Sequence, residues 1–278
     1  MSAGEHSRRL RQSAVPAKRG MLPCAAAASA AAFAVAAALA ADIPLAKRQS
    51  TYQQMSADTK AMQDEDTANP AMLWVLDGEA LWNRKQGAAG KSCADCHGDA
   101  HAGMKGVAAR YPAFDGARAR PVDLEQRINI CRAEQQKATP LPFESKELLA
   151  LTAYIGMQSR GMPIDSKDDE RLTPFLRAGE KLFKLRQGQL NLSCATCHDD
   201  NWGGKLAGAP IPQGHPNGYP LYRLEWQTLG SLQRRLRNCL IGMRAEAFAY
   251  GTPENVNLEL YLMWRARGMK VETPAVRP

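Results

Sequence analysis

Two pentapeptides of one form, Cys93-Ala94-Asp95-Cys96-His97 and Cys194-Ala195-Thr196-Cys197-His198, decide how this chain is organised. A Cys-x-x-Cys-His run is the attachment signature for c-type haem. The two thiols bond covalently to the porphyrin, and the histidine that follows can bind the iron as an axial ligand. Zinc-binding or thioredoxin-like cysteine pairs are the alternative interpretation. Because the motif occurs twice, each time opening a similar segment, we predict two covalently attached haem c groups.

The two motifs belong to an internal repeat. Residues 78–82 (GEALW) recur as residues 179–183 (GEKLF), and this run and the motifs share a shift of 101 residues. Further along, the shift becomes 107 or 108 residues for three matching sets, which are Tyr111-Pro112 and Tyr219-Pro220, Arg127 with Cys131 and Arg235 with Cys239, and Arg160-Gly161-Met162 and Arg267-Gly268-Met269. An insertion in the Gly- and Pro-rich loop of residues 201–218 explains the change. The chain is therefore predicted to be a duplication that divides near residues 165–169.

The apolar pattern of each repeat predicts helices. Leu73, Leu76, Ala80 and Leu81 have helical spacing before the first motif, and residues 172–183 do so before the second. Residues 124–131 and 229–243 are predicted as amphipathic helices, and residues 148–157 and 258–264 as closing helices. Strand runs of useful length are not evident, and long Gly/Pro-rich loops are expected where a chain wraps a haem. The predicted architecture is mainly α, with two fused cytochrome c-like domains (72–165 and 166–278) after an N-terminal arm (41–71).

The first forty residues differ in kind from the rest. They begin with a basic segment that contains Arg8, Arg9, Arg11, Lys18 and Arg19. An alanine-rich apolar run follows and ends in Ala38-Leu39-Ala40. This order predicts a signal peptide, residues 1–40, cleaved near Ala40, which sends the mature chain to the periplasm without a membrane span. An uncleaved membrane anchor is the alternative.

The net charge argues against one class of partner. The whole chain carries +8, and because the leader holds five of the basic residues and one acidic residue, the mature part carries +4. This surplus is spread over both repeats, without a basic run interleaved with aromatic residues. Nucleic-acid binding is therefore not predicted. A basic surface that attracts small anions or an acidic partner is compatible with the composition.

Two cysteines remain once the leader and the motifs are set aside. They are Cys131 and Cys239, and in an exported protein one disulfide would be the ordinary interpretation. The repeat favours another role, because each cysteine follows an arginine by four residues on a predicted helix and so shares its face. A neighbouring cation stabilises a thiolate, which suits an axial haem ligand. Met162 and Met269 are the competing axial ligands, although methionines there more often fill a core.

The second cysteine has the more basic surroundings. Arg234, Arg235 and Arg237 lie within five positions of Cys239, whereas the first repeat has Arg127 alone with an acid nearby. Such positive potential suits a dianionic, sulfur-bearing substrate, whose sulfonate Arg235 would hold together with Arg234 or Arg237. The second copy therefore looks catalytic and the first looks like a relic or a relay. The alternative is that these arginines form a solvated helix face or bind haem propionates.

These features together resemble the SoxA family, the dihaem subunits of the SoxAX cytochromes of bacterial sulfur oxidation. The resemblance covers essentially all of residues 72–270. It implies that His97 and Cys131 are axial ligands of the first haem, and His198 and Cys239 those of the second. It also implies that Cys239 is the active-site cysteine, able to carry a persulfide, and that Arg235 binds the substrate.

The resemblance implies an activity as well. Members of the family act as L-cysteine S-thiosulfotransferases, which oxidatively couple thiosulfate to a cysteine of the carrier SoxYZ and pass electrons to the haem of the small partner SoxX. A dihaem electron-transfer cytochrome without catalysis is one rival, and a thiosulfate dehydrogenase that forms tetrathionate is another. A dihaem peroxidase fits less well, because it does not call for an arginine-flanked cysteine.

Overall fold

The computed structural model describes residues 43–165 and 169–278. The predicted signal peptide and part of the predicted linker lie outside these residues. Within the described part, we find no helix with the length and apolar character needed to cross a membrane.

The described residues are mainly helical, as predicted. The α-helices are α1 (Ala57–Asp64), α2 (Met72–Asn83), α3 (Ala94–His97), α4 (Ala100–Gly103), α5 (Leu124–Cys131), α6 (Lys146–Met157), α7 (Thr173–Lys184), α8 (Cys194–His198), α9 (Leu232–Gly242) and α10 (Pro253–Arg265). The short 3-10 and π segments are η1 (Leu45–Lys47), η2 (Thr51–Gln54), η3 (Ala108–Arg110), η4 (Arg132–Gln136) and η5 (Glu170–Leu172). The strands are β1 (Ala113–Asp115), β2 (Arg120–Val122), β3 (Lys205–Leu206), β4 (Ala209–Pro210), β5 (Leu221–Arg223), β6 (Thr228–Gly230) and β7 (Ala275–Arg277).

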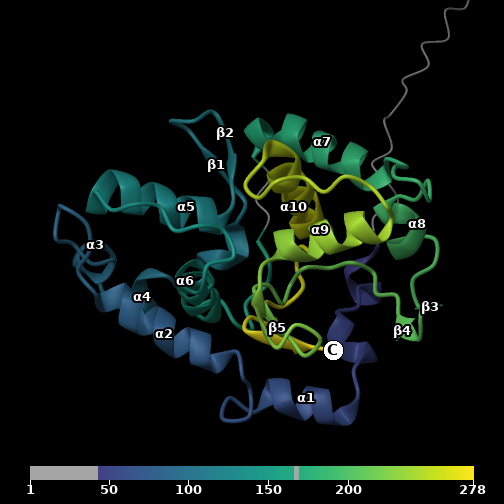
Figure 1. Cartoon of the computed structure of the whole chain (residues 1–278), viewed down its shortest axis with the longest axis horizontal. Helices are drawn as coiled ribbons and strands as arrows, with labels where there is room; N and C mark the ends of the chain where they lie inside the picture. The colour runs from purple at the N-terminus through teal and green to yellow at the C-terminus, as the bar shows by residue number, and fades with distance from the viewer. Residues whose placement is uncertain (1–42, 166–168) are drawn as a thin grey trace, which may run out of the picture. The chain divides into compact units, whose positions relative to one another are not determined.

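Each repeat is built on the contact between its first long helix and its last. Helix α2 packs on α6, and α7 packs on α10 (Figure 1). A glycine sits at each crossing, because a Cβ on Gly78 would strike the carbonyl of Ala150 and one on Gly179 would strike the carbonyl of Asn257. Both glycines belong to the repeated runs 78–82 and 179–183. The repeated glycine therefore allows the same close crossing of two helices in both halves.

The aromatic packing beside each crossing is also duplicated. Trp82 lies 6.0 Å from Tyr154 between ring centroids, and Phe183 lies 5.4 Å from Tyr261. The predicted helix is confirmed as α2, in which Leu73 and Leu76 are 62% and 58% exposed. The helix instead buries Val75, Gly78, Leu81 and Trp82. The buried face thus follows the glycine at the crossing rather than the leucines.

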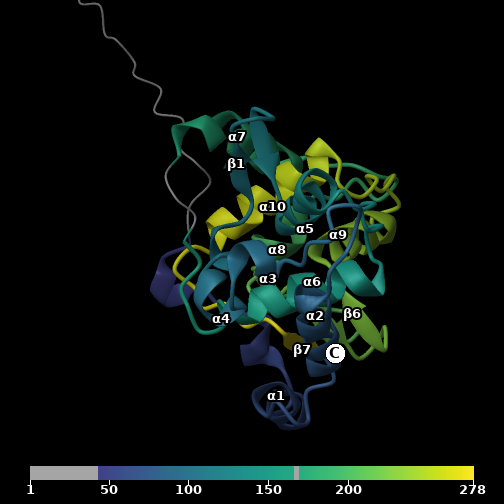
Figure 2. The same ribbon diagram turned by 90° about the vertical axis from the view of Figure 1, so that its left-hand side faces the viewer.

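A short hairpin precedes the cysteine-bearing helix of each repeat. Strands β1 and β2 pair antiparallel before α5, and β5 and β6 pair antiparallel before α9. Residues 229–230, which were predicted to open a helix, therefore lie in β6. Helix α9 begins after its N-cap Ser231, whose side chain accepts a hydrogen bond from the Arg234 amide. Strand β7 joins β5 in parallel register, and α1 packs against β7 (Figure 2). The N-terminal arm thus contacts the C-terminal strand.

The two repeats meet with two-fold symmetry. After the closing helix of the first repeat, the Gly161 amide donates to the Val271 carbonyl at 2.8 Å, and the equivalent Gly268 amide donates to the Ile164 carbonyl at 2.9 Å. The Val271 and Ile164 amides return hydrogen bonds to Met162 and Met269, at 2.9 and 2.8 Å. Each bond has its counterpart 107 residues away. This reciprocity shows that the duplicated halves form a two-fold pair within one chain.

Candidate active site

The second attachment motif is a short helix with a fixed histidine. Helix α8 begins after Ser193, whose hydroxyl accepts from the Thr196 amide at 3.1 Å. At its other end, Nδ1 of His198 lies 2.7 Å from the carbonyl oxygen of Pro212. A carbonyl only accepts, so Nδ1 donates to it and Nε2 is the ring nitrogen left for another partner. Metal-binding histidines are commonly oriented by such a bond, so His198 is well suited to bind a haem iron.

Cys239 faces this histidine from α9. Burial disfavours its thiolate, but a hydrogen bond with His198 and the positive charge of Arg235 outweigh burial and lower the pKa of Cys239. The Cys239 sulfur also lies close to the two motif cysteines. Burial and the charge of Cys239 together raise the pKa of Cys194 to about 12, and they also raise the pKa of Cys197. Two haem-attaching thiols, an imidazole and a thiolate therefore converge, and this donor set fits a haem c with His198 and Cys239 as axial ligands.

The first motif has a similar but less polarised arrangement. Cys131 of α5 lies near Cys93 and Cys96. Burial raises the pKa of Cys93, and the charge of Cys131 raises it further. Burial likewise raises the pKa of Cys131, and the charge of Cys96 adds to this rise. His97 ends α3 and lies beside Trp82, with 5.8 Å between ring centroids. Burial raises the pKa of Cys131 in spite of Arg127. The thiolate is therefore favoured in the second copy and disfavoured in the first.

The alternatives for the extra sulfur residues are not supported. Cys131 and Cys239 are both free thiols, so they do not form the disulfide that their number would allow. Met269 is 9% exposed and packs in an apolar cluster with Ile164 and Val271. Met162 takes part in the symmetric backbone pairing and lies against Gly106. Both methionines thus have structural roles at the junction of the repeats.

Arg235 shares the helix face of Cys239, as the spacing predicts. It makes no ion pair within residues 43–165 and 169–278, and the charges that interact with it belong to Cys239, Tyr219 and Glu225. Burial lowers the pKa of Arg235, but these negative potentials outweigh burial and raise it. A half-buried guanidinium that forms no ion pair in the described part of the chain, next to a cysteine sulfur, is a place where an anion can bind.

Arg234 and Arg237, which we expected to assist Arg235, contact other groups in this structure. The Arg234 guanidinium lies 4.4 Å from the Trp226 ring centroid and 3.9 Å from the Glu144 carboxylate. Arg237 donates to the Phe248 carbonyl and lies 4.8 Å from the centroid of Tyr250. Neighbours on a helix point about 100° apart, so residues one and two positions from Arg235 face other elements. A second arginine does act on Cys239, but it is Arg223 of β5.

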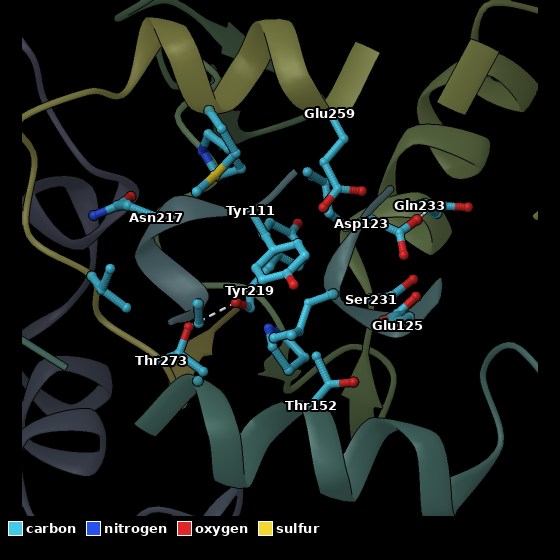
Figure 3. Close-up of a pocket in the computed structure, with 18 of the residues that line it drawn as sticks. Tyr111, Asp123, Glu125, Thr152, Asn217, Tyr219, Ser231, Gln233, Glu259 and Thr273 are labelled. Atoms are coloured by element: carbon cyan, nitrogen blue, oxygen red, sulfur yellow. Dashed lines mark hydrogen bonds between the residues drawn. The ribbon is translucent and has the colours of Figure 1, made fainter. Parts of the chain in front are cut away.

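A cavity lies where the two repeats meet (Figure 3). It is lined by equivalent residues from both halves, which are Tyr111 and Tyr219, Asp123 and Ser231, Glu125 and Gln233, and Thr152 and Glu259. Asp123 and Ser231 are the N-caps of α5 and α9. The cavity therefore lies on the internal two-fold axis, and it does not contain the motif cysteines.

Three of these lining residues are carboxylic acids held close together. Burial raises the pKa of Asp123 to about 6, against hydrogen bonds from Gln126 and Gln233. Burial also raises the pKa of Glu125 and of Glu259, and the charge of Asp123 raises both further. Figure 3 shows Glu259, Asp123 and Gln233 on one side of the cavity. All three acids therefore hold their protons to a higher pH in the folded protein than in the unfolded chain.

We expect the stability of the folded chain to depend on this acid cluster. Glu125 is 7% exposed and its neighbours Asp123, Glu259 and Glu144 all carry like charge. Because the folded protein holds the Glu125 proton more tightly than the unfolded chain does, this group contributes its full stabilisation below its unfolded pKa, about 4.3. The stabilisation is lost as the pH rises through the folded pKa. Glu125→Gln should therefore raise the free energy of unfolding at pH 7 by about 1–2 kcal/mol and leave it unchanged at pH 4. Thermal unfolding of both proteins across this range measures the difference, and equal stabilities at pH 7 would contradict it.

The fold and the attachment motifs together define the class: the chain is a c-type cytochrome made of two cytochrome c domains. A family model described as SoxA/TsdA, cytochrome c domain, matches residues 77–164 and 178–271. The chain belongs to this SoxA/TsdA family.

Named relatives agree with this assignment. The chain is 42% identical over 223 residues to the L-cysteine S-thiosulfotransferase subunit SoxA of Pseudaminobacter salicylatoxidans, covering 80% of this chain and 78% of that protein. It is 37% identical to the same subunit of Rhodovulum sulfidophilum, covering 79% and 77%. Among solved structures it resembles SoxXA from P. pantotrophus, with a TM-score of 0.80, 33% identity, and coverage of 83% of this chain and 87% of that one.

Proposed function

We propose that this chain is the catalytic subunit of a periplasmic dihaem cytochrome that couples thiosulfate to a cysteine of a carrier protein, as an L-cysteine S-thiosulfotransferase. One observation carries the proposal: His198 and Arg235 both act on Cys239 and lower its pKa, and Arg235 forms no ion pair among the residues that the structure describes. The names of the relatives, which are L-cysteine S-thiosulfotransferase subunits, support it.

The residues for two haem c groups are present. Cys93 and Cys96 would attach the first haem and Cys194 and Cys197 the second. The axial ligands would be His97 with Cys131, and His198 with Cys239. When bound, haem c accepts and passes on one electron at a time.

The chain's own residues suit each part of the reaction. The guanidinium of Arg235 would hold the sulfonate of thiosulfate, which brings the sulfane sulfur to Cys239. The Cys239 thiolate bonds to that sulfane sulfur, and the two electrons released leave to an acceptor. The carrier thiol then loses its proton and attacks the same sulfane sulfur, so that a carrier–S–S–sulfonate forms and Cys239 returns to a thiolate. The sum is one new sulfur–sulfur bond, one proton and two electrons.

Two electrons exceed what one haem accepts, so the proposal includes a second acceptor. We assign this role to a small monohaem cytochrome of the SoxX type, in a heterodimer, and assign the carrier to the SoxYZ type. The solved relative is a SoxXA structure, which supports such a pairing. We further propose an arm at residues 41–71 and domains at 72–165 and 166–278. The second domain carries the reaction, while the first haem takes little part.

A product assay tests the proposal. The holoprotein with its small haem partner and an electron acceptor is given thiosulfate and a carrier protein with one reactive cysteine, and the carrier is weighed by intact mass. We expect a thiosulfonate adduct on that cysteine. Tetrathionate formed equally well without a carrier would instead identify a thiosulfate dehydrogenase, and electron flow with neither product would identify an electron carrier.

A further inference from the structure

The hairpin before each cysteine-bearing helix is the same structure in both repeats. Ala113 pairs with Val122 and Asp115 with Arg120 in the first, and Leu221 pairs with Gly230 and Arg223 with Thr228 in the second. Every one of these positions is shifted by 108 residues, as are Arg127 and Arg235. Position 223 of the second repeat therefore corresponds to position 115 of the first.

The first repeat shows what a side chain at this position can reach. Oδ2 of Asp115 lies 2.7 Å from a terminal nitrogen of Arg127, the arginine four residues before Cys131. The same carboxylate lies 3.3 Å from Arg118. Asp115 is 4% exposed, so this ion pair is held inside the protein. The arginine next to the first cysteine is thereby neutralised and is not available to a dianion.

The second repeat replaces this aspartate with Arg223. Arg223 and Arg235 therefore occupy the two positions that form an ion pair in the first repeat, and the Arg223 guanidinium lies 5.5 Å from the centroid of the Trp226 ring. Both arginines lie near one buried neighbour: burial raises the pKa of Tyr219 to about 12, and the charges of Arg235 and Arg223 oppose the rise. Two like charges near each other repel, so an anion that binds between them is attracted by both.

We infer that Arg223 is a second substrate-binding residue, which clamps the sulfonate of thiosulfate together with Arg235. The change from aspartate to arginine at this hairpin position makes the second repeat, and not the first, the one that takes a dianion. This inference rests on the proposed function, because it names a further residue of the same site.

Glu225 is the group that competes with the substrate for Arg223. Its Oε2 lies 2.8 Å from Nε of Arg223, and the Glu225 side chain is 65% exposed. An exposed carboxylate two residues away is a weak partner that water can replace. The guanidinium keeps two terminal nitrogens for a sulfonate while Nε bonds to Glu225. Glu225 thus tunes the affinity of the clamp, and its removal should strengthen anion binding.

A charge series at this position tests the inference on the holoprotein with its haem partner. Arg223→Gln should raise KM for thiosulfate about 10-fold with kcat within about 3-fold, since one charge-assisted hydrogen bond is lost. Arg223→Lys should recover part of the loss. Arg223→Asp, which reproduces the first repeat, should raise KM more than Arg223→Gln does, because the carboxylate would pair with Arg235. Glu225→Gln should lower KM. Lys205→Gln, which removes an exposed charge of β3 in the same repeat, is the matched control and should change nothing.

Equilibrium binding separates this inference from the proposed function. Calorimetric titration of the holoproteins with thiosulfate should give a dissociation constant that follows the same order as KM. If wild type binds thiosulfate and Arg223→Gln does not, yet no carrier adduct forms, the clamp stands and the proposed reaction fails. If wild type forms the adduct while Arg223→Gln keeps the wild-type KM and affinity, the inference is overturned. A lower melting temperature with unchanged affinity would likewise show a merely structural role.

Discussion

Replacing Cys239 with alanine should abolish transfer of thiosulfate to the carrier cysteine. The sulfur of Cys239 is the one favoured as a thiolate, through its contact with His198 and the charges of Arg235 and Arg223. Alanine removes the atom that bonds to the sulfane sulfur, and losing a nucleophile of this kind lowers a rate by several orders of magnitude. Intact mass of the carrier after incubation with thiosulfate, the small haem partner and an electron acceptor gives the result directly.

A second variant separates loss of the nucleophile from loss of an axial ligand. Cys239→Met keeps a sulfur that can bind iron, but a thioether cannot form the sulfur–sulfur bond with thiosulfate. We expect both variants to retain covalent haem, measured by the pyridine haemochrome spectrum, and neither to form the adduct. Adduct formation by either variant at the wild-type rate would rule out Cys239 as the reacting sulfur.

The first repeat provides a comparison for the same chemistry. Cys131 has a raised pKa from burial, and its arginine is paired with Asp115. Cys131→Ala should change the spectrum of the first haem but reduce adduct formation by less than about 10-fold, since the proposed transfer site lies in the other repeat. A loss as large as that of Cys239→Ala would instead give the first haem a part in turnover.

The sequence could predict the repeat, the attachment motifs and the pairing of Arg235 with Cys239, because these follow from local spacing. It could not predict the role of Arg223. Repeat alignment places Arg223 opposite Asp115, but only the paired strands of the hairpin show that this position reaches the arginine of the next helix. The contacts of Arg234 and Arg237 could not be predicted either, because their partners Trp226 and Tyr250 lie in loops that carry no periodic pattern.

The symmetric junction between the two repeats could not be predicted from sequence patterns either. The repeat predicts two similar halves but not how they meet, and the meeting depends on backbone hydrogen bonds such as Gly161 to Val271. It also brings Glu259 of α10 into one cavity with Asp123 and Glu125, which lie at the start of α5, far away in the chain. In the second repeat the counterparts of Asp123 and Glu125 are uncharged, so the cluster arises from divergence between the halves.

The close helix crossings should be the most sensitive points of the fold. A Cβ on Gly179 of α7 would strike the Asn257 carbonyl of α10 and lie 2.8 Å from the Tyr261 Cβ. Backbone atoms of a buried helix cannot move aside as a flexible side chain can, so Gly179→Ala must push α7 away from α10. We expect a cost of about 3 kcal/mol, which exceeds the roughly 1 kcal/mol that alanine gains in a helix.

Thermal unfolding of the holoprotein measures this effect. A net loss of about 2–3 kcal/mol should lower Tm by roughly 5–10 °C for a chain of this size. Gly78→Ala should behave alike, because its Cβ would strike the Ala150 carbonyl and lie 2.7 Å from the Tyr154 Cβ. Gly116→Ala is the matched control, since a Cβ there meets nothing within 4 Å and should leave Tm within about 2 °C. If Gly179→Ala unfolds together with this control, the helices do not cross as closely as the repeated glycines require.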